Sequence, residues 1–519
     1  MESNRLVIDD DNFDRYNYRD SDWSEGDVDD GFYSFPNYNN EDIDDVENEQ
    51  NYYFDEVSMH KDDGKLYIFL YYLYRNCIVP SMLQIFHHLK LLLLLCVIFN
   101  LSAVFFQKVL SFNLLSNELH NKLLHCVSFV IGLVALHSFQ GSKIINFLSL
   151  ICIVYGTLFF CEYTSPKKSI KGPVVTFIVL SHLLICELIC FDQSTWHTIR
   201  GTQMILSMKL ISLAFDIDNK VIKHIPNFFN VFGYSLHVGS LIFGPWISYK
   251  DYLNCCSSIC TFTTLNCGKW LVKCSICLTT SLICLIISTC FSEVLASHQS
   301  NIWLQSYKEA LSFRFSHYFV CKLSEATILL SSNNFNYDVP ITKIRNIELP
   351  RSLVDVVVSW NIPMHKWLKT YIFQTSRHLG DLASILITYI ISAFLHGLNF
   401  QLSAVLLSLG IYSYIEYNLR RKLSYLLNAC VQTRSCKAGC QHRHQHDLIV
   451  LATNSIFFVI TIFHLAYLGC TFDNNDTQTQ GYSMAHTLSK WSHLAYASPI
   501  LAIMMMSINF ILRCNHHSR

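Results

Sequence analysis

Long runs of apolar residues constrain this chain more than any other feature of its sequence. They occupy residues 90–106, 120–139, 145–161, 173–191, 271–291, 380–400, 401–416, 448–470 and 493–512. An α-helix needs about 20 such residues to cross the hydrocarbon core of a bilayer. Only 15% of the 519 residues are charged, against about a quarter in a typical soluble domain. The sequence therefore predicts an all-α, polytopic membrane protein.

Three further segments are long but more polar, at residues 196–216, 228–249 and 313–331. They carry Lys209 and Glu325 together with several glycines. Polar backbone at membrane depth is tolerated only where it packs inside protein or lines a wet cavity. We therefore expect these segments to be interior or re-entrant pieces of a helical bundle with about nine to eleven transmembrane helices.

The first 65 residues differ in composition from the rest of the chain. They hold 21 of the 39 acidic residues and show no apolar period. Like charges repel, and a segment with so little apolar surface cannot build a core. We predict a disordered acidic tail at residues 1–65, a membrane domain at 66–513 and a short cytosolic tail at 514–519.

Loop charges and a glycosylation motif predict the orientation of the C-terminal half. The connection 417–447 is rich in Lys and Arg, and basic loops stay in the cytosol. The next connection, 471–492, contains the sequon Asn475-Asp476-Thr477, which is glycosylated only on the lumenal side. Both signals predict that the helix containing His396 ends near the lumen.

The chain has 21 cysteines, and we expect most of them to pack in the protein interior. Cys152, Cys186, Cys284 and Cys290 lie inside apolar runs, where we expect small core side chains. We identify no nucleophile arrangement among the cysteines.

One loop combines cysteine with histidine at close spacing. Cys436, Cys440, His442, His444 and His446 form a group with metal-binding residue types. The spacing is not that of an ordinary zinc module, and three basic residues share the loop. We therefore expect no bound metal.

His396 lies in an otherwise apolar run, where an imidazole is costly unless it is used or satisfied. A neutral imidazole accepts a proton near pH 7, as a general base must. A core histidine bonded to a neighbouring carbonyl explains the residue equally well, so chemistry alone leaves both interpretations open.

A second polar residue, Asn361, stands in the segment Trp360-Asn361-Ile362-Pro363, followed by Trp367 and Tyr371. Proline suits the first turn of a helix, and the aromatic residues suit a helix at the membrane interface. An Asn amide can also donate to a developing oxyanion. Taken alone, the interfacial helix is the better interpretation.

Together, Asn361 and His396 resemble the membrane-bound O-acyltransferase family. Its mark is an Asn on an amphipathic segment, followed by a His in a hydrophobic helix. Longer stretches are similar to the branch of this family that lipidates Wnt proteins: residues 200–218, 232–249, 315–327, 359–373, 392–409 and 462–469. The likeness covers about residues 66–512, so the acidic tail lies outside it.

The resemblance implies an enzyme of the endoplasmic reticulum membrane. Its donor would be palmitoleoyl-coenzyme A from the cytosolic side, and its acceptor a serine of a Wnt protein (Wingless and its relatives in an insect) in the lumen. His396 would act as the base and Asn361 would position the thioester or stabilise its oxygen. No cofactor beyond the donor and no nucleic-acid partner is implied. Substrate contacts are expected from Trp360, Tyr389, Ser392, Leu395, Arg200 and Lys209.

Three other functions remain open from the residues themselves. An acyltransferase of the same family with another acceptor, such as a peptide or a lipid, would share Asn361 and His396. A transporter or channel would also carry polar residues at membrane depth. A chaperone that escorts lipidated cargo would bind the cargo without acylating it.

Overall fold

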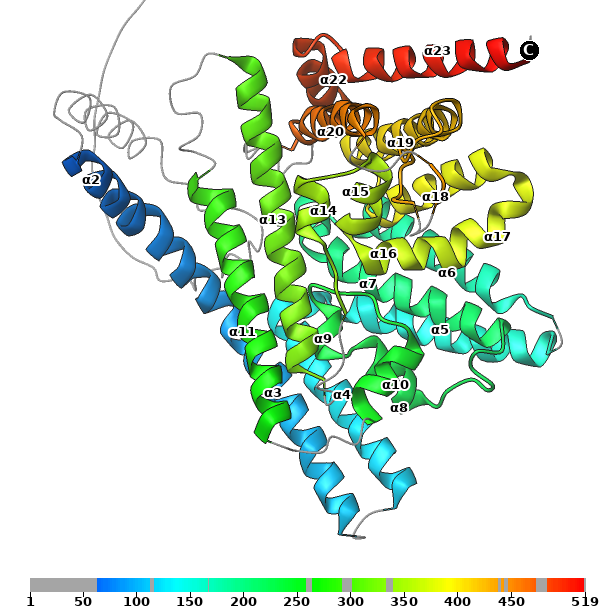
Figure 1. Cartoon of the computed structure of the whole chain (residues 1–519). Coiled ribbons are helices and arrows are strands. Elements are labelled where there is room, and N and C mark those ends of the chain that lie inside the picture. The colour runs from blue at the N-terminus through cyan, green and yellow to red at the C-terminus, as the bar shows by residue number, and fades with distance from the viewer. Residues whose placement is uncertain are drawn as a thin grey trace, which may run out of the picture. The chain divides into compact units, whose positions relative to one another are not determined.

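A computed structural model describes residues 63–112, 116–166, 168–257, 264–291, 301–332, 339–436, 440–442, 447–472 and 483–517. Every regular element in these ranges is a helix, which confirms the predicted class (Figure 1). The apolar stretches of membrane-spanning length are formed by α2 (Asp63–Leu73), η1 (Tyr74–Ile78), α3 (Val79–Ser111), α4 (Asn117–Gln140), α5 (Ile144–Thr164), α6 (Lys171–Ile185), η3 (Cys186–Cys190), α11 (Thr264–Ile286), η4 (Ile287–Phe291) and α20 (Leu448–Gly469).

Within the described ranges, five helical stretches are long and apolar enough to cross a membrane. The count becomes six when the bent pair α22 (Met484–His493) and α23 (Ala497–His517) is taken as one span. The expected nine to eleven spans are not decided by this criterion, because α7 (Gln193–Asp218), α13 (Ile302–Leu330) and α19 (Phe400–Leu426) are long but more polar. The chain is a membrane protein with several apolar helices.

Helix α7 lies in the interior, as predicted for residues 196–216. Sixteen of its residues are buried, and the apolar ones among them belong to the main hydrophobic core. Its Lys209 is fully buried and donates hydrogen bonds to the carbonyls of Tyr234 (3.1 Å) and Ser235 (3.3 Å) and to the Ser240 hydroxyl (2.9 Å). The ammonium group thus has three acceptors, which is what a buried charge requires.

These acceptors belong to a broken helix. The predicted polar piece 228–249 forms α8 (Phe228–Ser235) and the single turn α9 (Val238–Leu241), followed by non-helical chain to α10 (Tyr249–Ser257). A break leaves carbonyls at the end of α8 without helical partners, and Lys209 supplies donors for two of them. This arrangement confirms that the segment packs inside the protein.

Helix α13 packs beside α11 and α20 and fixes the short helix α14 (Ile344–Glu348). The Arg314 guanidinium donates to both Glu348 carboxylate oxygens, at 2.8 and 3.2 Å, and the Tyr318 hydroxyl donates to the same carboxylate at 2.7 Å. A bidentate pair of this kind sets orientation as well as contact. It holds α14, and with it the start of α15 (Leu353–Trp360), against α13.

The segment after Pro363 forms α16 (Ile362–Trp367), η5 (Leu368–Phe373) and α17 (Gln374–Ser376). Trp367 is fully buried and donates to the Met208 carbonyl of α7 at 2.9 Å, and Tyr371 donates to Asp216 at 2.9 Å. Both aromatic side chains are buried in protein, and their place at the membrane interface stays a prediction. Their polar atoms find partners in the interior, so they anchor the segment to α7.

Helices α18 (Asp381–Leu395) and α19 pack together, with bounds that differ from the apolar runs. The predicted helix 380–400 ends at Leu395. Helix α19 continues to Leu426, so the predicted loop 417–447 begins only after that residue. Arg420 is not a loop residue: it is fully buried, pairs with Glu416 and donates to backbone carbonyls. These hydrogen bonds allow the helix to extend past the end of the apolar run.

Smaller differences concern the chain ends and the cysteines. Helix α2 begins at Asp63 and α23 reaches His517, so the predicted tails at 1–65 and 514–519 overlap helices. Cys186 and Cys284 are buried as expected, whereas Cys152 is exposed on α5. Cys290 is buried and forms a disulfide with Cys77.

Candidate active site

His396 lies in the tight turn that joins α18 to α19. It is the C-cap residue of α18, and its backbone N–H is shared between the carbonyls of Ser392 (3.2 Å) and Ala393 (3.1 Å). The sequence prediction put His396 inside the helix. The structure instead places His396 just past the last helical residue, so its imidazole lies at the end of the helix and not along its side.

The turn is held from another element by Glu187 of η3. The Glu187 carboxylate accepts a hydrogen bond from the Leu398 backbone N–H at 2.7 Å. Gly397 adopts φ +95°, a conformation that glycine adopts readily. A Cβ at Gly397 would lie 2.9 Å from the Glu187 carboxylate and 3.4 Å from the Trp196 indole nitrogen. The close approach of η3 and α7 therefore requires glycine beside His396.

The electrostatic neighbours of the His396 ring are Arg200 of α7 and His317 of α13. Arg200 also interacts electrostatically with Glu187. The cation, the carboxylate and the turn thus belong to one local arrangement. Four separate elements, α18, η3, α7 and α13, supply it.

His317 connects this turn to the predicted Asn361 segment. Its ring stacks on Trp360, with ring centroids 4.3 Å apart and planes at 9°, and its Nε2 lies 3.0 Å from the Trp360 carbonyl oxygen. A carbonyl only accepts, so Nε2 carries the proton and Nδ1 of the neutral ring is left as an acceptor. His317 therefore contacts Trp360 directly and acts electrostatically on the His396 ring.

Asn361 stands between α15 and α16. Its side-chain oxygen accepts from the Met364 N–H at 3.0 Å, which makes it the N-cap of α16, with Pro363 in the first turn. This confirms the predicted helix start at this position. The cap uses the amide oxygen, so the amide nitrogen is the atom that can donate to a ligand.

The residues predicted to contact substrate lie in several different parts of the structure. Arg200 is an electrostatic neighbour of His396, and Trp360 contacts His317. Ser392 and Leu395 are buried at the end of α18, and Leu395 joins the main core. Tyr389 packs against Gly410 in a narrow groove between α18 and α19. Lys209 is enclosed by the broken helix, as described above.

Sequence reasoning did not single out Glu187 or His317. Glu187 is a polar residue in an apolar run, the same signal that drew attention to His396, whereas His317 lies in the more polar α13. Nothing local ties them to His396, because Glu187 contacts a residue 211 positions away. The predicted glycosylation site Asn475 lies outside the described residues.

The chain thus carries an imidazole at the end of α18 and, one segment earlier, a side-chain amide at the start of α16. An imidazole can remove a proton from a hydroxyl, and an amide N–H can stabilise a developing oxyanion. The combination suits acyl transfer to an alcohol, where both functions are needed in one step.

Comparison with known proteins agrees with this chemistry. The sequence profile of the membrane-bound O-acyltransferase family matches residues 143–415, a range that contains Glu187, Arg200, His317, Asn361 and His396. The chain belongs to the membrane-bound O-acyltransferase family, which is a family of acyltransferases.

Within that family, the chain is similar to curated proteins named protein-serine O-palmitoleoyltransferase porcupine. The human protein is 37% identical over 461 residues, which cover 83% of this chain and 95% of the relative. The Drosophila melanogaster protein is 30% identical, over 83% of this chain and 84% of the relative. Lysophospholipid acyltransferase 2 of Arabidopsis thaliana is more distant, at 23% identity over 64% of this chain and 83% of the relative.

Proposed function

We propose that this protein transfers a palmitoleoyl group from palmitoleoyl-coenzyme A to a serine hydroxyl of a Wnt protein. The observation that carries the proposal is the similarity to protein-serine O-palmitoleoyltransferases along almost the whole membrane domain. The placement of His396 at a helix end, clamped by a second element, supports it.

In the proposed reaction, His396 takes the proton of the acceptor serine while the serine oxygen attacks the thioester carbonyl. The carbonyl oxygen becomes an oxyanion, and the Asn361 amide nitrogen donates to it. The carbon–sulfur bond then breaks, coenzyme A leaves as the thiol with the proton held by His396, and the serine ester remains. No covalent acyl-enzyme is needed, because the acceptor attacks the donor directly.

The surrounding residues position these two groups. Glu187 fixes the backbone directly after His396, and His317 packs against Trp360 directly before Asn361. A general base works only within hydrogen-bond reach of the proton it removes. These two contacts therefore hold the segments of His396 and Asn361 in the positions that the reaction requires.

We place the enzyme in the endoplasmic reticulum membrane, with the acceptor entering from the lumen and the donor from the cytosol. The basic connection after α19 and the sequon at Asn475 support this orientation. The site itself needs no further cofactor for this reaction.

The test is acylation by the purified full-length protein in detergent. Palmitoleoyl-coenzyme A and a serine-containing Wnt peptide are supplied, and the peptide mass is measured. The expected result is one palmitoleoyl group on the peptide and none on a matched peptide with alanine at that serine.

A second arm replaces the peptide with a lysophospholipid, the acceptor class named for the more distant relatives. Acylation of the lipid but not of the peptide would contradict the proposed acceptor while keeping acyl transfer. Absence of acyl transfer to either acceptor by folded, donor-binding protein would overturn the proposal and favour a transporter or chaperone.

A further inference from the structure

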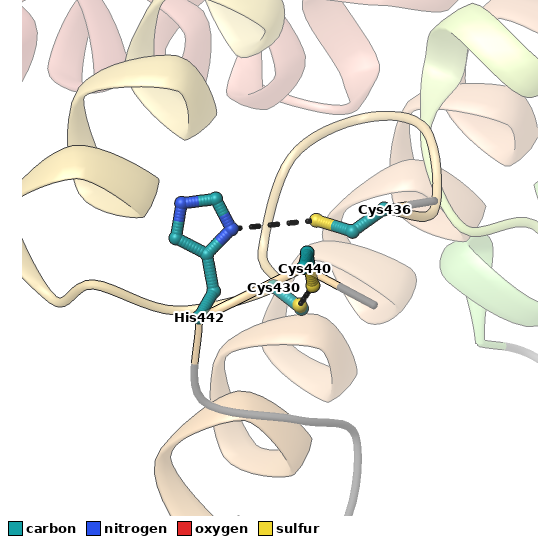
Figure 2. Close-up of side chains that lie close together, drawn as sticks. All are labelled: Cys430, Cys436, Cys440 and His442. Carbon is teal, nitrogen blue, oxygen red and sulfur yellow. Dashed lines mark hydrogen bonds between the residues drawn. The ribbon is translucent and has the colours of Figure 1, made fainter. Parts of the chain in front are cut away.

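The connection between α19 and α20 brings four metal-binding side chains together. Figure 2 shows the sulfur atoms of Cys430, Cys436 and Cys440 and the ring of His442 gathered in one place. Their ligand atoms all lie within 4.8 Å of one another. The sequence group predicted from spacing did not include Cys430, which is the buried member of the four. His444 and His446 lie outside the described residues.

The separations fit one small tetrahedral ion. The Cys430 and Cys440 sulfurs are 3.3 Å apart, and the Cys436 sulfur is 3.9 Å from Nδ1 of His442. The bond from zinc to sulfur is about 2.3 Å long, and the bond to nitrogen about 2.0 Å. In a tetrahedral site these lengths place the ligand atoms roughly 3.5–3.8 Å from one another. A disulfide would require about 2.05 Å between the two sulfurs. Three thiols and an imidazole gathered around one point suit a metal better than one bond between two of them.

Two arginine side chains fix the backbone that carries Cys430. Arg351 donates to the Cys430 carbonyl at 2.7 Å and to the Gln432 carbonyl at 3.0 Å. Arg420 donates to the Val431 carbonyl at 2.7 Å. Cys430 and Val431 are buried in a small apolar cluster against which Cys436 and Cys440 pack. A prearranged first ligand reduces the ordering that metal binding would require.

The local charge suits a thiolate-rich site. Three thiolates and one divalent cation carry a net negative charge. Arg351 and Arg420 hold the backbone at the first ligand. Both also interact electrostatically with the Asp355 carboxylate, and so does Arg434. Arg351 and Arg420 therefore place positive charge at the backbone of the first ligand. The loop is also predicted to be cytosolic, where thiols stay reduced and bind metal rather than pair.

We propose that Cys430, Cys436, Cys440 and His442 bind a structural Zn²⁺ ion. Four protein ligands close the coordination sphere, which is typical of structural rather than catalytic zinc. The ion would tie the loop to the start of α15, because Ser352 donates to the Thr433 carbonyl at 3.1 Å and Arg351 holds residues 430 and 432. Helix α15 ends at Trp360, directly before Asn361, so the site would steady the segment that carries Asn361.

The experiment measures metal in the full-length protein purified in detergent without added chelator. We expect about one zinc per chain by elemental mass spectrometry. Exchange with Co²⁺ should give the intense ligand-field bands of a tetrahedral ion together with thiolate-to-cobalt charge-transfer absorption. The variants Cys436→Ser and His442→Ala should each retain about fivefold less zinc after dialysis against a chelator. The control Cys152→Ser, an exposed cysteine on α5, should retain the wild-type amount.

Several results would overturn the proposal. One is folded wild-type protein that holds no zinc and binds no Co²⁺, which needs no variant and so does not depend on variant folding. Another is a Cys430–Cys440 disulfide detected by mass spectrometry of the unreduced protein. Equal loss of zinc in Cys152→Ser would place the metal elsewhere. None of these measurements uses acyl transfer, so they are independent of the proposed function.

Discussion

At the scale of single residues, the two proposed catalytic side chains also occupy structural positions. His396 ends α18 and Asn361 begins α16. For His396 the structural role belongs to the backbone N–H, which any residue other than proline supplies. For Asn361 it belongs to the side-chain oxygen. Substitutions can therefore separate structure from chemistry at both positions.

Replacing His396 with alanine should remove the base and leave the turn intact. Loss of a general base typically lowers a rate by about 10²–10⁴-fold. Binding of acyl-coenzyme A should persist, and the rate is measured per folded, donor-binding molecule. The matched control is His378→Ala, since His378 is an exposed residue after α17. A normalised rate of His396→Ala within a few-fold of wild type would mean that His396 is a core histidine.

Asn361 allows a sharper separation. Aspartate is as good an N-cap as asparagine, so Asn361→Asp should leave thermal stability almost unchanged. The carboxylate cannot donate and repels the oxyanion, so turnover should fall by about 10²–10³-fold. Asn361→Ala should lose the same activity and also about 1 kcal/mol of stability.

The control for the Asn361 variants is Asn227→Asp, the same change at the exposed N-cap of α8. This control should alter neither activity nor stability. Wild-type turnover in Asn361→Asp would restrict the role of Asn361 to helix capping.

At the scale of elements, the site depends on how closely η3 and α7 approach the α18–α19 turn. Gly397→Ala should disturb this approach in two ways. The new methyl group would meet the Glu187 carboxylate, and φ +95° is strained for alanine by about 1–3 kcal/mol. We expect a lower melting temperature and a lower rate, because the His396 backbone must shift. Thermal denaturation and the acylation assay measure the two effects.

Gly201→Ala is the matched control for this prediction. Gly201 lies in α7 next to Arg200, and a Cβ there meets nothing within 4 Å. Alanine in a helix interior stabilises by roughly 0.5–1 kcal/mol over glycine. Activity should therefore be preserved in this variant. If both glycine variants behave alike, close packing at Gly397 is not required for the site.

At the scale of the whole molecule, the acidic N-terminal region should be separable from the enzyme. Residues 1–62 lie outside the described residues, and the described helices begin at Asp63. A segment so rich in like charge and so poor in apolar residues cannot supply a core. Deletion of residues 1–60 should leave the yield of folded protein and the acylation rate within about twofold of wild type. A normal yield with a lost rate would instead show that this region takes part in the reaction.

The sequence by itself determined the membrane class, the helical content and the two main catalytic candidates. Hydropathy decides whether a segment enters a bilayer, and helix capping depends on neighbours within one turn. Both are local properties. The sequence also predicted that residues 196–216 and 228–249 are interior and that a helix starts near Asn361, and the structure confirms each.

Only the tertiary structure decided which distant residues complete the site and the loop. Glu187 reaches Leu398 across 211 residues, and His317 reaches Trp360 across 43. Arg351 fixes Cys430 across 79 residues, which places a further candidate ligand beside three of the five that spacing had grouped. No periodicity or spacing marks such pairs in the sequence, because they arise when whole helices pack and bring unrelated segments to one point. The extension of α19 through Arg420 has the same origin, since a buried arginine is stable there only with the carbonyls that the folded loop supplies.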